Sequence, residues 1–272
     1  MAKLDLSSSE IPGRIQQNLI AYMRLFAGLP GMVMEDSAHP DEETFWFVSN
    51  KPAPGNSILR ARWRKEGVED RIDALFAEIG RNIDEIDWMV YPGDQPADLG
   101  RRLEARGMQG GPGGNWLWTG LASLVPAPTT PDGFHIERVI DDRMMAEWVR
   151  VSEAGFEGEL GCFYDAYARH GYGPGAFSLH YTGYLGDIPV TSGTLLDAGG
   201  TAAIYDVSTP REYRRQGLGG AITHALMAEI QRRGYGETWI WSSDIARSVY
   251  QKLGFVEADF GVREYHWRKN TA

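Results

Sequence analysis

The sequence predicts an α/β protein with mixed β-sheets, divided into two domains. Short runs of β-branched and aromatic residues alternate along the chain with longer segments in which apolar residues recur every three or four positions. The clearest case is residues 201–230, where a strand, a basic glycine-rich turn and a helix follow one another. A proline-rich stretch at 126–133 separates this region from the first part of the chain and predicts a linker there.

Residues 1–125 are expected to form a smaller N-terminal α/β domain. Periodic apolar residues predict helices at 11–26, 68–79 and 96–106, and short β-rich runs predict strands at 44–48, 57–63 and 87–91. The glycine-rich segment 110–115 follows a helix instead of opening one, which favours a mobile loop over a phosphate site.

Residues 134–272 are expected to form the second domain. The predicted strands are 134–139, 177–185, 190–196, 201–207, 238–242 and 262–267. Four helices are predicted to begin near residues 142, 163, 218 and 244, and Gly234 and Gly254 end the last two. The resulting order of elements is βααβββαβαβ.

Composition limits the classes of function. A net charge of −10 argues against an extended nucleic-acid surface, which requires clustered cations. The single cysteine excludes an internal disulfide framework and fits a reducing compartment. No apolar run approaches the length of a membrane span, and the N-terminus lacks the apolar core of a signal peptide. We therefore expect a cytoplasmic monomer or homodimer that binds neither nucleic acid nor membrane.

The turn before the helix at residue 218 has the composition of an anion site. Two adjacent arginines supply charge-assisted donors, and three glycines let backbone N–H groups approach a ligand. The partial positive charge at the helix N-terminus adds to this attraction. A phosphate or pyrophosphate is the expected ligand, and the alternative is a tight strand-to-helix turn with solvated arginines. The turn consists of Arg214, Arg215, Gln216, Gly217, Leu218, Gly219 and Gly220.

The spacing of this turn narrows the choice of phosphate ligand. A Walker loop needs Gly-Lys followed by Ser or Thr, which is absent, and a Rossmann fingerprint needs a third glycine where Ile222 stands. What remains is Arg-x-x-Gly-x-Gly, from Arg214 to Gly219, which resembles the coenzyme A pyrophosphate loop of the GNAT (general N-acetyltransferase) superfamily. Residues 243–255 also resemble the Asn-x-x-Ala-x-x-x-Tyr-x-x-x-Gly-Phe run that follows this loop in the superfamily, with serine in place of the asparagine.

The resemblance covers residues 134–272 and implies a GNAT fold for that domain. The first part of the chain has a similar order of elements, and residues 99–108 stand where residues 249–255 stand in the second part. No Arg-x-x-Gly-x-Gly loop precedes the helix at 68–79. The resemblance therefore implies a tandem GNAT protein with a degenerate N-terminal half, and an unrelated α/β accessory domain is the alternative.

By the same resemblance, acetyl-CoA is the co-substrate. The cofactor strand splays from its neighbour, so that backbone groups of Val207 and Thr209 hold the pantetheine arm and the thioester, and the amides of residues 216–221 hold the pyrophosphate. No metal is expected, because no cluster of His, Cys and carboxylates has metal spacing. The implied cofactor-binding residues are Val207, Thr209, Arg214, Arg215, Gln216, Gly217, Leu218, Gly219, Gly220, Ala221 and Ser243.

The implied catalytic acid is Tyr250, which matches the position from which family members protonate the leaving thiolate; a packing role is the alternative. The base is open, because Ala203 stands where the protein-lysine branch carries a glutamate. Asp206 and Tyr205 are the candidates on the cofactor strand and are expected to face opposite sides of it, with a structural role equally open for both. Weaker candidates are Glu153, Glu157, Glu159 and His180.

The implied function is direct transfer of an acetyl group to the primary amine of a small molecule, in a pocket near residues 155–164 and Tyr172. Two alternatives remain open. One is a regulator that binds acyl-CoA without turnover. The other is a protein or peptide N-acetyltransferase, whose basic substrates the acidic composition would attract.

Overall fold

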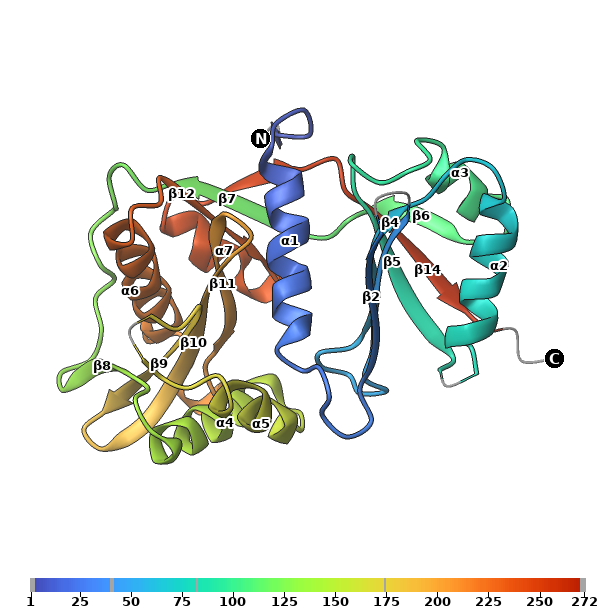
Figure 1. Cartoon of the computed structure of the whole chain (residues 1–272). Coiled ribbons are helices and arrows are strands. Elements are labelled where there is room, and N and C mark those ends of the chain that lie inside the picture. The colour runs from blue at the N-terminus through green and yellow to red at the C-terminus, as the bar shows by residue number, and fades with distance from the viewer. Residues whose placement is uncertain (1–2, 40–41, 82, 174, 270–272) are drawn as a thin grey trace. The chain divides into compact units, whose positions relative to one another are not determined.

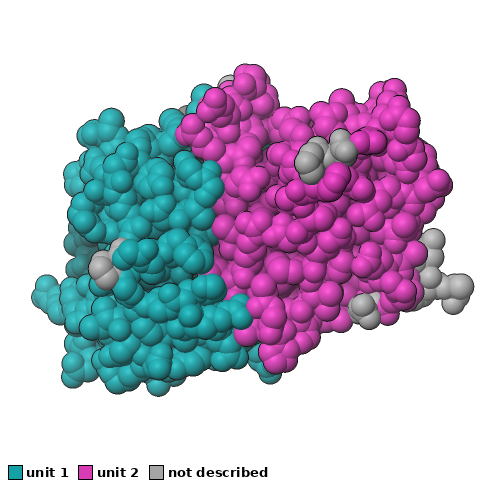
Figure 2. All heavy atoms as spheres, in the orientation of Figure 1, with its two compact units in different colours: residues 1–4, 115–258 teal, residues 5–114, 259–272 magenta. Residues whose placement is uncertain are grey.

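The computed structural model describes residues 3–39, 42–81, 83–173 and 175–269. The chain divides into two compact units, unit 1 with residues 1–4 and 115–258 and unit 2 with residues 5–114 and 259–272 (Figures 1 and 2). Each unit contains one mixed sheet with helices packed on it, which confirms the predicted α/β class. No helix in the described ranges is both long and apolar enough to cross a membrane.

Unit 1 is built on an eight-stranded sheet with the order β1-β13-β7-β12-β11-β10-β9-β8. Its strands are β1 (Leu4–Asp5), β7 (Trp116–Gly120), β8 (Phe134–Arg138), β9 (Ser178–Leu185), β10 (Ile188–Ala198), β11 (Thr201–Ser208), β12 (Glu237–Trp241) and β13 (Val256–Asp259). Its helices are α4 (Asp142–Phe156), α5 (Gly161–Ala168), α6 (Leu218–Arg232) and α7 (Asp244–Lys252), with a short 3-10 helix, η1 (Arg211–Tyr213).

Neighbouring residues of β10 show which helix covers each face of this sheet. Leu195 lies in a buried cluster with Leu226 of α6. Thr194 bonds His180 of β9, whose ring packs against helices α4 and α5. Successive side chains of a strand point to opposite faces. Helix α6 therefore covers one face, and α4 and α5 cover the other.

Unit 2 is built on a six-stranded sheet with the order β2-β3-β4-β5-β14-β6. Its strands are β2 (Val33–His39), β3 (Glu42–Val48), β4 (Asn56–Arg62), β5 (Glu85–Val90), β6 (Gln109–Pro112) and β14 (Arg263–Arg268). Its helices are α1 (Ile11–Arg24), α2 (Val68–Ile79) and α3 (Leu99–Glu104). Its buried core brings together apolar side chains of α2, α3 and the sheet.

The two sheets repeat one pattern. In unit 1 the antiparallel strands β9, β10 and β11 precede α6 and the parallel strand β12, and in unit 2 β2, β3 and β4 precede α2 and the parallel strand β5. In each sheet the strand that pairs beyond the parallel pair is distant in sequence from it. In unit 1 this strand is β7, which pairs with β12 and β13. In unit 2 it is β14, which pairs with β5 and β6.

The units therefore differ from the domains expected at 1–125 and 134–272. Strand β7 precedes the predicted boundary but belongs to the sheet of unit 1, and β14, expected to close the second domain, belongs to unit 2. The glycine-rich segment expected to be a loop also differs, because Gln109–Pro112 forms β6 and pairs with β14.

The proline-rich segment at 126–133 lies along α6 as part of unit 1. Just before it, the Leu121 carbonyl accepts a bond from Gln231, and the Val125 carbonyl lies 2.8 Å from Nε2 of His224. Pro128 and the Thr129 carbonyl then lie against Gly220 and Gly217 at the start of α6. The chain thus follows α6 from its C-terminal end to its N-terminal end (Figure 1).

Candidate functional site

The site begins where β11 and β12 separate. The two parallel strands pair only at Ala203 with Trp239 and at Ile204 with Ile240. Strand β11 continues to Ser208, whereas β12 ends at Trp241. Beyond this short ladder the two strands form a fork, as the family resemblance implies for the strand that holds the cofactor.

A β-bulge distorts β11 just past the fork. Tyr205 pairs with Thr194 and Ser208 with Ser192, so that Asp206 and Val207 stand opposite one residue of β10. Asp206 adopts a φ of 52°, an uncommon conformation for a residue that is not glycine. Backbone strain of this kind is concentrated at functional sites.

The bulge corrects the expectation that Asp206 and Tyr205 face opposite sides. The carboxylate of Asp206 accepts a 2.6 Å hydrogen bond from the hydroxyl of Tyr167, which lies on α5. Tyr205 is paired with Thr194, whose side chain faces α4 and α5. Both candidates therefore lie on the face that α4 and α5 cover.

The loop between β11 and α6 is anchored by the first of its two arginines. The guanidinium of Arg214 donates to the carbonyls of Thr209, at 3.0 Å, and Gly155, at 2.8 Å. It also lies 3.7 Å from the carboxylate of Glu157. Arg214, predicted to bind the cofactor, thus fixes the loop to the end of α4. Arg215 is exposed and has a φ of 63°.

The start of α6 presents backbone N–H groups at this loop. The bond from the Ala221 N–H to the Gly217 carbonyl is the first of the helix, so the N–H groups of residues 218–220 have no partner within it. Gly217 has a φ of 80°, which favours glycine, and a Cβ there would collide with the Thr129 carbonyl. A Cβ at Gly219 would stand 3.4 Å from Oγ1 of Thr209, so the loop, the end of β11 and the helix N-terminus are adjacent.

An apolar surface borders the helix N-terminus. Ile245 and Val249 lie one turn apart on α7 and are exposed, as is Trp241 at the end of β12. The Val249 side chain is 3.5 Å from the position of a Cβ on Gly220. The N-cap residue of α7 is Ser243, predicted to contact pantetheine, and its side chain makes no capping bond.

Tyr250 is buried on α7, in the same apolar cluster as Leu226 and Ile240, with Val207 packed against that cluster. Its ring centroid lies 6.0 Å from that of Phe255. Burial raises the pKa of Tyr250 above its ordinary value, so the phenol carries its proton at neutral pH. A buried, protonated phenol next to the cofactor strand has the protonation state of a general acid.

Three of the four weaker base candidates make other contacts, and the fourth is exposed. His180 is buried, its Nδ1 lies 2.9 Å from Oγ1 of Thr194, and burial lowers its pKa to about 3. Glu153 accepts the Leu160 N–H at 2.9 Å, and Glu157 pairs with Arg211. Glu159 is exposed.

Sequence reasoning missed Tyr167. It lies within the predicted helix at 163–170, but no local pattern connects it with Asp206, which is 39 positions further along the chain. The hydroxyl of Tyr172 donates to Asp142 at 2.8 Å, at the start of α4, whereas residues 155–164 lie at the other end of this helix. Over the described ranges, no group of three or more His, Cys, Asp or Glu side chains could hold a metal ion.

Comparisons with known proteins identify a family domain and relatives for part of the chain. Residues 186–266 match the family model of the acetyltransferase (GNAT) domain. An 85-residue stretch is 32% identical to the [ribosomal protein bS18]-alanine N-acetyltransferase of Escherichia coli strain K12, covering 30% of this chain and 55% of that protein. The chain therefore spans about half the length of the curated relatives it matches.

Two solved structures share the fold over nearly the whole chain. A GCN5-related N-acetyltransferase from Kribbella flavida superposes with a TM-score of 0.64 at 16% identity, over 94% of this chain and 96% of that one. A tandem GNAT protein from the clavulanic acid biosynthesis pathway gives a TM-score of 0.62 at 16% identity, over 100% of this chain and 98% of that one. At such identities the likeness shows the fold alone. Residues 186–266 therefore match the GNAT domain, and the fold of the chain is similar to that of GNAT proteins.

Proposed function

We propose that the chain is an acetyl-CoA-dependent N-acetyltransferase that acts on the primary amine of a small molecule by direct transfer. The observation that carries the proposal is the fork between β11 and β12, with the N-terminus of α6 beside it. An extended arm fits along the free edge of β11, and a phosphate fits against the helix N-terminus. A pantetheine arm joined to a pyrophosphate has both features.

The chain's own residues fit acetyl-CoA at this place. The N–H groups of residues 217–220 and the exposed Arg215 would hold the pyrophosphate. The main chain of Val207 and Thr209 would hold the arm, with Ile245 and Val249 as its apolar wall. When bound, acetyl-CoA supplies an acetyl group on an activated thioester and a thiolate leaving group.

We assign roles in proton transfer to three side chains. The carboxylate of Asp206 would take a proton from the acceptor's ammonium group, directly or through water, so that a neutral amine can attack. The hydroxyl of Tyr167 would position that carboxylate through the 2.6 Å bond. Tyr250, protonated at neutral pH, would give its proton to the departing sulfur. The acceptor would enter near residues 155–164, on the side where Tyr167 meets Asp206.

A second candidate function is N-acetylation of a protein's terminal amine. The relative from Escherichia coli is named for the alanine of a ribosomal protein. The net charge of −10 would also attract basic protein tails.

The test is acetyl-CoA-dependent thiol release with two groups of acceptors, small primary amines and peptides that begin with alanine. We expect a kcat/KM at least about 100-fold higher for a small amine. Preference for the peptides would establish the second candidate, and binding without release on either group would indicate a sensor.

Two variants connect the activity to the site. Gly219→Leu should abolish acetyl-CoA binding, because its side chain would occupy the approach to the helix N–H groups. Gly236→Leu is the matched control, since Gly236 is exposed and a Cβ there meets nothing within 4 Å. Tyr250→Phe should keep acetyl-CoA binding and lower kcat by about 10²-fold or more. No binding by the wild-type chain would overturn the proposal.

A further inference from the structure

Unit 2 has the same kind of fork as unit 1. Its parallel strands β4 and β5 pair at Ser57 with Asp87 and at Ile58 with Trp88, and β4 then continues to Arg62. A bulge follows the ladder here too. Trp46 of β3 pairs with Ile58 and Phe45 with Arg60, which leaves Leu59 as an extra residue of β4.

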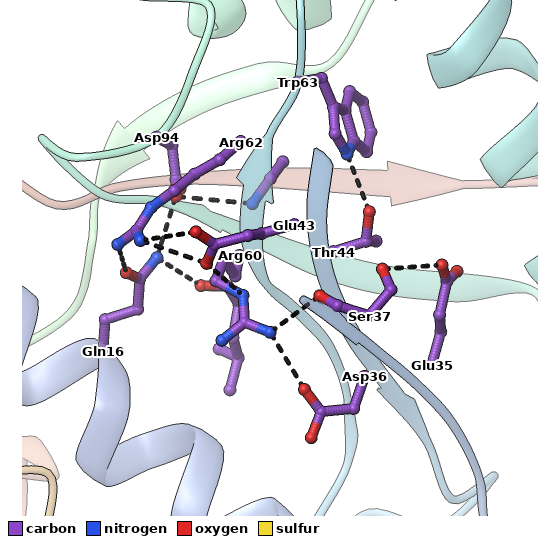
Figure 3. A network of polar contacts seen from close by, with 12 residues as sticks. Gln16, Glu35, Asp36, Ser37, Glu43, Thr44, Arg60, Arg62, Trp63 and Asp94 are labelled. Atoms are coloured by element: carbon purple, nitrogen blue, oxygen red, sulfur yellow. Dashed lines mark hydrogen bonds and ion pairs between the residues drawn. The ribbon is translucent and has the colours of Figure 1, made fainter. Parts of the chain in front are cut away.

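Two side chains close this fork (Figure 3). Nε2 of Gln16, on α1, donates to the Leu59 carbonyl at 2.8 Å and to Oδ1 of Asp94 at 2.9 Å. Oδ1 of Asp94 also accepts the Ala61 N–H at 3.4 Å, and Oδ2 accepts the Tyr91 N–H at 2.9 Å. We call Gln16 and Asp94 the closing pair.

The backbone after β5 completes the closure. The Gln95 N–H donates to the Ala61 carbonyl at 2.9 Å, and the Trp63 N–H donates to the Gln95 carbonyl at 3.1 Å. Both the N–H and the carbonyl of Ala61 are thus bonded within the unit, and a bound arm would have to displace these contacts. Ala61 is three residues past the ladder residue Ile58, as Val207 is three past Ile204.

The closing pair is itself held in place. Both residues are buried: Gln16 is fully buried, and Asp94 is 3% exposed. Oε1 of Gln16 accepts a 3.1 Å bond from Arg62, which pairs with Glu43. In unit 1, by contrast, the acidic residue after β12 is Asp244, whose side chain is 85% exposed and bonds Asn115 and Arg247.

The helix that follows the fork in unit 2 is also unsuited to a pyrophosphate. The first turn of α2 carries Glu69 and Asp70, whereas the first turn of α6 carries no acidic residue. Carboxylates at a helix N-terminus compete with an anionic ligand for the partial positive charge there. This electrostatic observation is independent of the closing pair and points in the same direction.

We infer that the closing pair occupies, in unit 2, the place that pantetheine takes in unit 1, so that the chain binds one acetyl-CoA. The inference rests on the proposed function for the position of the cofactor in unit 1. Unit 2 is then a GNAT half whose cofactor cleft is filled by its own α1 and by the turn after β5.

Calorimetry with acetyl-CoA on the whole chain tests the stoichiometry. We expect one site per chain in the wild type and in the control Gly236→Leu, and no residual binding in Gly219→Leu. Two sites in the wild type, or a site that survives Gly219→Leu, would overturn the inference. No binding at all by the wild type would overturn the proposed function instead, and the closure is then tested by a second measurement.

That measurement is hydrogen exchange of single amides without ligand. We expect the Ala61 and Gln95 N–H groups to exchange at least about 100-fold more slowly than in an unstructured peptide. Asp94→Ala should speed exchange at Ala61 and Tyr91 about 10-fold or more, with strand β10 of unit 1 unchanged. Unprotected Ala61 and Gln95 amides in the wild type would overturn the closure, whatever binds in unit 1.

Discussion

Asp206 combines backbone strain with a short hydrogen bond from a buried tyrosine. Its positive φ turns the carboxylate out of the regular alternation of β11 and toward Tyr167. Tyr167 is fully buried and packs against Trp148 and His180, so its hydroxyl is fixed in position. These features explain how a strand residue could serve as a positioned base.

Tyr167→Phe tests the positioning role. The hydroxyl stabilises the ionised carboxylate, so its loss should move the acid limb of the pH profile of kcat/KM upward by about 1 pH unit. Activity should fall about 10-fold at low pH and recover at high pH. The control is Tyr235→Phe, which removes a tyrosine hydroxyl that likewise donates to an aspartate, Asp197, outside the proposed site. An equal loss at every pH would instead indicate a purely structural role for Tyr167.

Asp94 should make stability depend on pH. Burial raises its pKa to about 7 against the hydrogen bonds that lower it. The folded state then binds the proton more tightly than the unfolded state. The contribution of Asp94 to the free energy of unfolding is therefore largest below about pH 4. This contribution should fall by on the order of 4 kcal/mol as the pH rises to about 8.

Denaturant unfolding of the wild type and Asp94→Asn over this pH range measures the effect. The variant has no titratable group at position 94. Its free energy of unfolding should therefore fall less with rising pH than that of the wild type, by the amount that Asp94 contributes. Identical pH dependence in the two proteins would show that Asp94 is ionised throughout the range.

At the residue scale, the roles given to the loop and to Tyr250 stay predictions, and the direction expected for the Asp206 side chain was wrong. Strict alternation along a strand puts Asp206 and Tyr205 on opposite faces, and the bulge puts them on the same one. A bulge with glycine at the left-handed position could have been suspected from the sequence, but here that position is an aspartate. Tyr167 could not be found, because its contact with Asp206 depends on how α5 packs on the sheet.

The loop that precedes α6 depends on contacts with α4. The guanidinium of Arg214 donates hydrogen bonds to the carbonyl of Thr209 on the loop and to the carbonyl of Gly155 on α4. A Cβ at Gly155 would collide with the Ser208 hydroxyl, which shows how closely α4 approaches β11. The loop geometry is therefore set by an interaction between elements.

Replacing each arginine by alanine should separate anchoring from direct binding. Arg214→Ala should weaken acetyl-CoA binding about 10-fold with little change in its salt dependence, because the loop loses its anchor. Arg215→Ala should weaken binding by a similar factor and reduce the salt dependence, because a cation near the ligand is lost. The same salt dependence in both variants would contradict the division of roles.

Elements with a strong apolar period were predicted closely, and short or polar ones were missed. The predicted helices at 11–26 and 68–79 match α1 and α2 to within two residues. Strand β2 was missed because Val33–His39 is mostly polar, and β6 because glycines normally indicate a loop. These strands are stabilised by their partners in the sheet rather than by their own sequence.

At the scale of the whole molecule, each sheet is completed by a strand from the other part of the chain. Strand β7 lies between β12 and β13 and carries the fully buried Leu117. Strand β14 lies between β5 and β6. The predicted linker therefore does not mark a position at which the chain can be cut into two folding units.

Two fragments test this organisation. Residues 134–272 lack β7, so the fragment should leave β12 and β13 without their shared partner and should aggregate. Residues 113–260 contain every strand of unit 1 except the short β1 and should fold. Far-UV circular dichroism and NMR dispersion distinguish the outcomes, and a folded 134–272 fragment would contradict the assignment of β7.

The sequence could not show this exchange of strands. The run that forms β14 was predicted as a strand and the run that forms β7 was not, and nothing in either run specifies its sheet. The proline-rich segment between them has the composition of a linker, although it lies along α6. The fold class and the GNAT match of residues 186–266 could be predicted because they depend on local patterns, whereas the boundary depends on pairing between distant segments.

A crystal structure with bound coenzyme A would test whether the fork of unit 1 holds the cofactor. We expect one molecule per chain, with its pyrophosphate at the N–H groups of residues 217–220 and its arm along Val207 and Thr209. Its sulfur should lie within roughly 3–4 Å of the Tyr250 hydroxyl, the reach of a hydrogen bond to sulfur. Coenzyme A bound in unit 2, or bound to unit 1 away from this fork, would show that the fork of unit 1 is not the cofactor site.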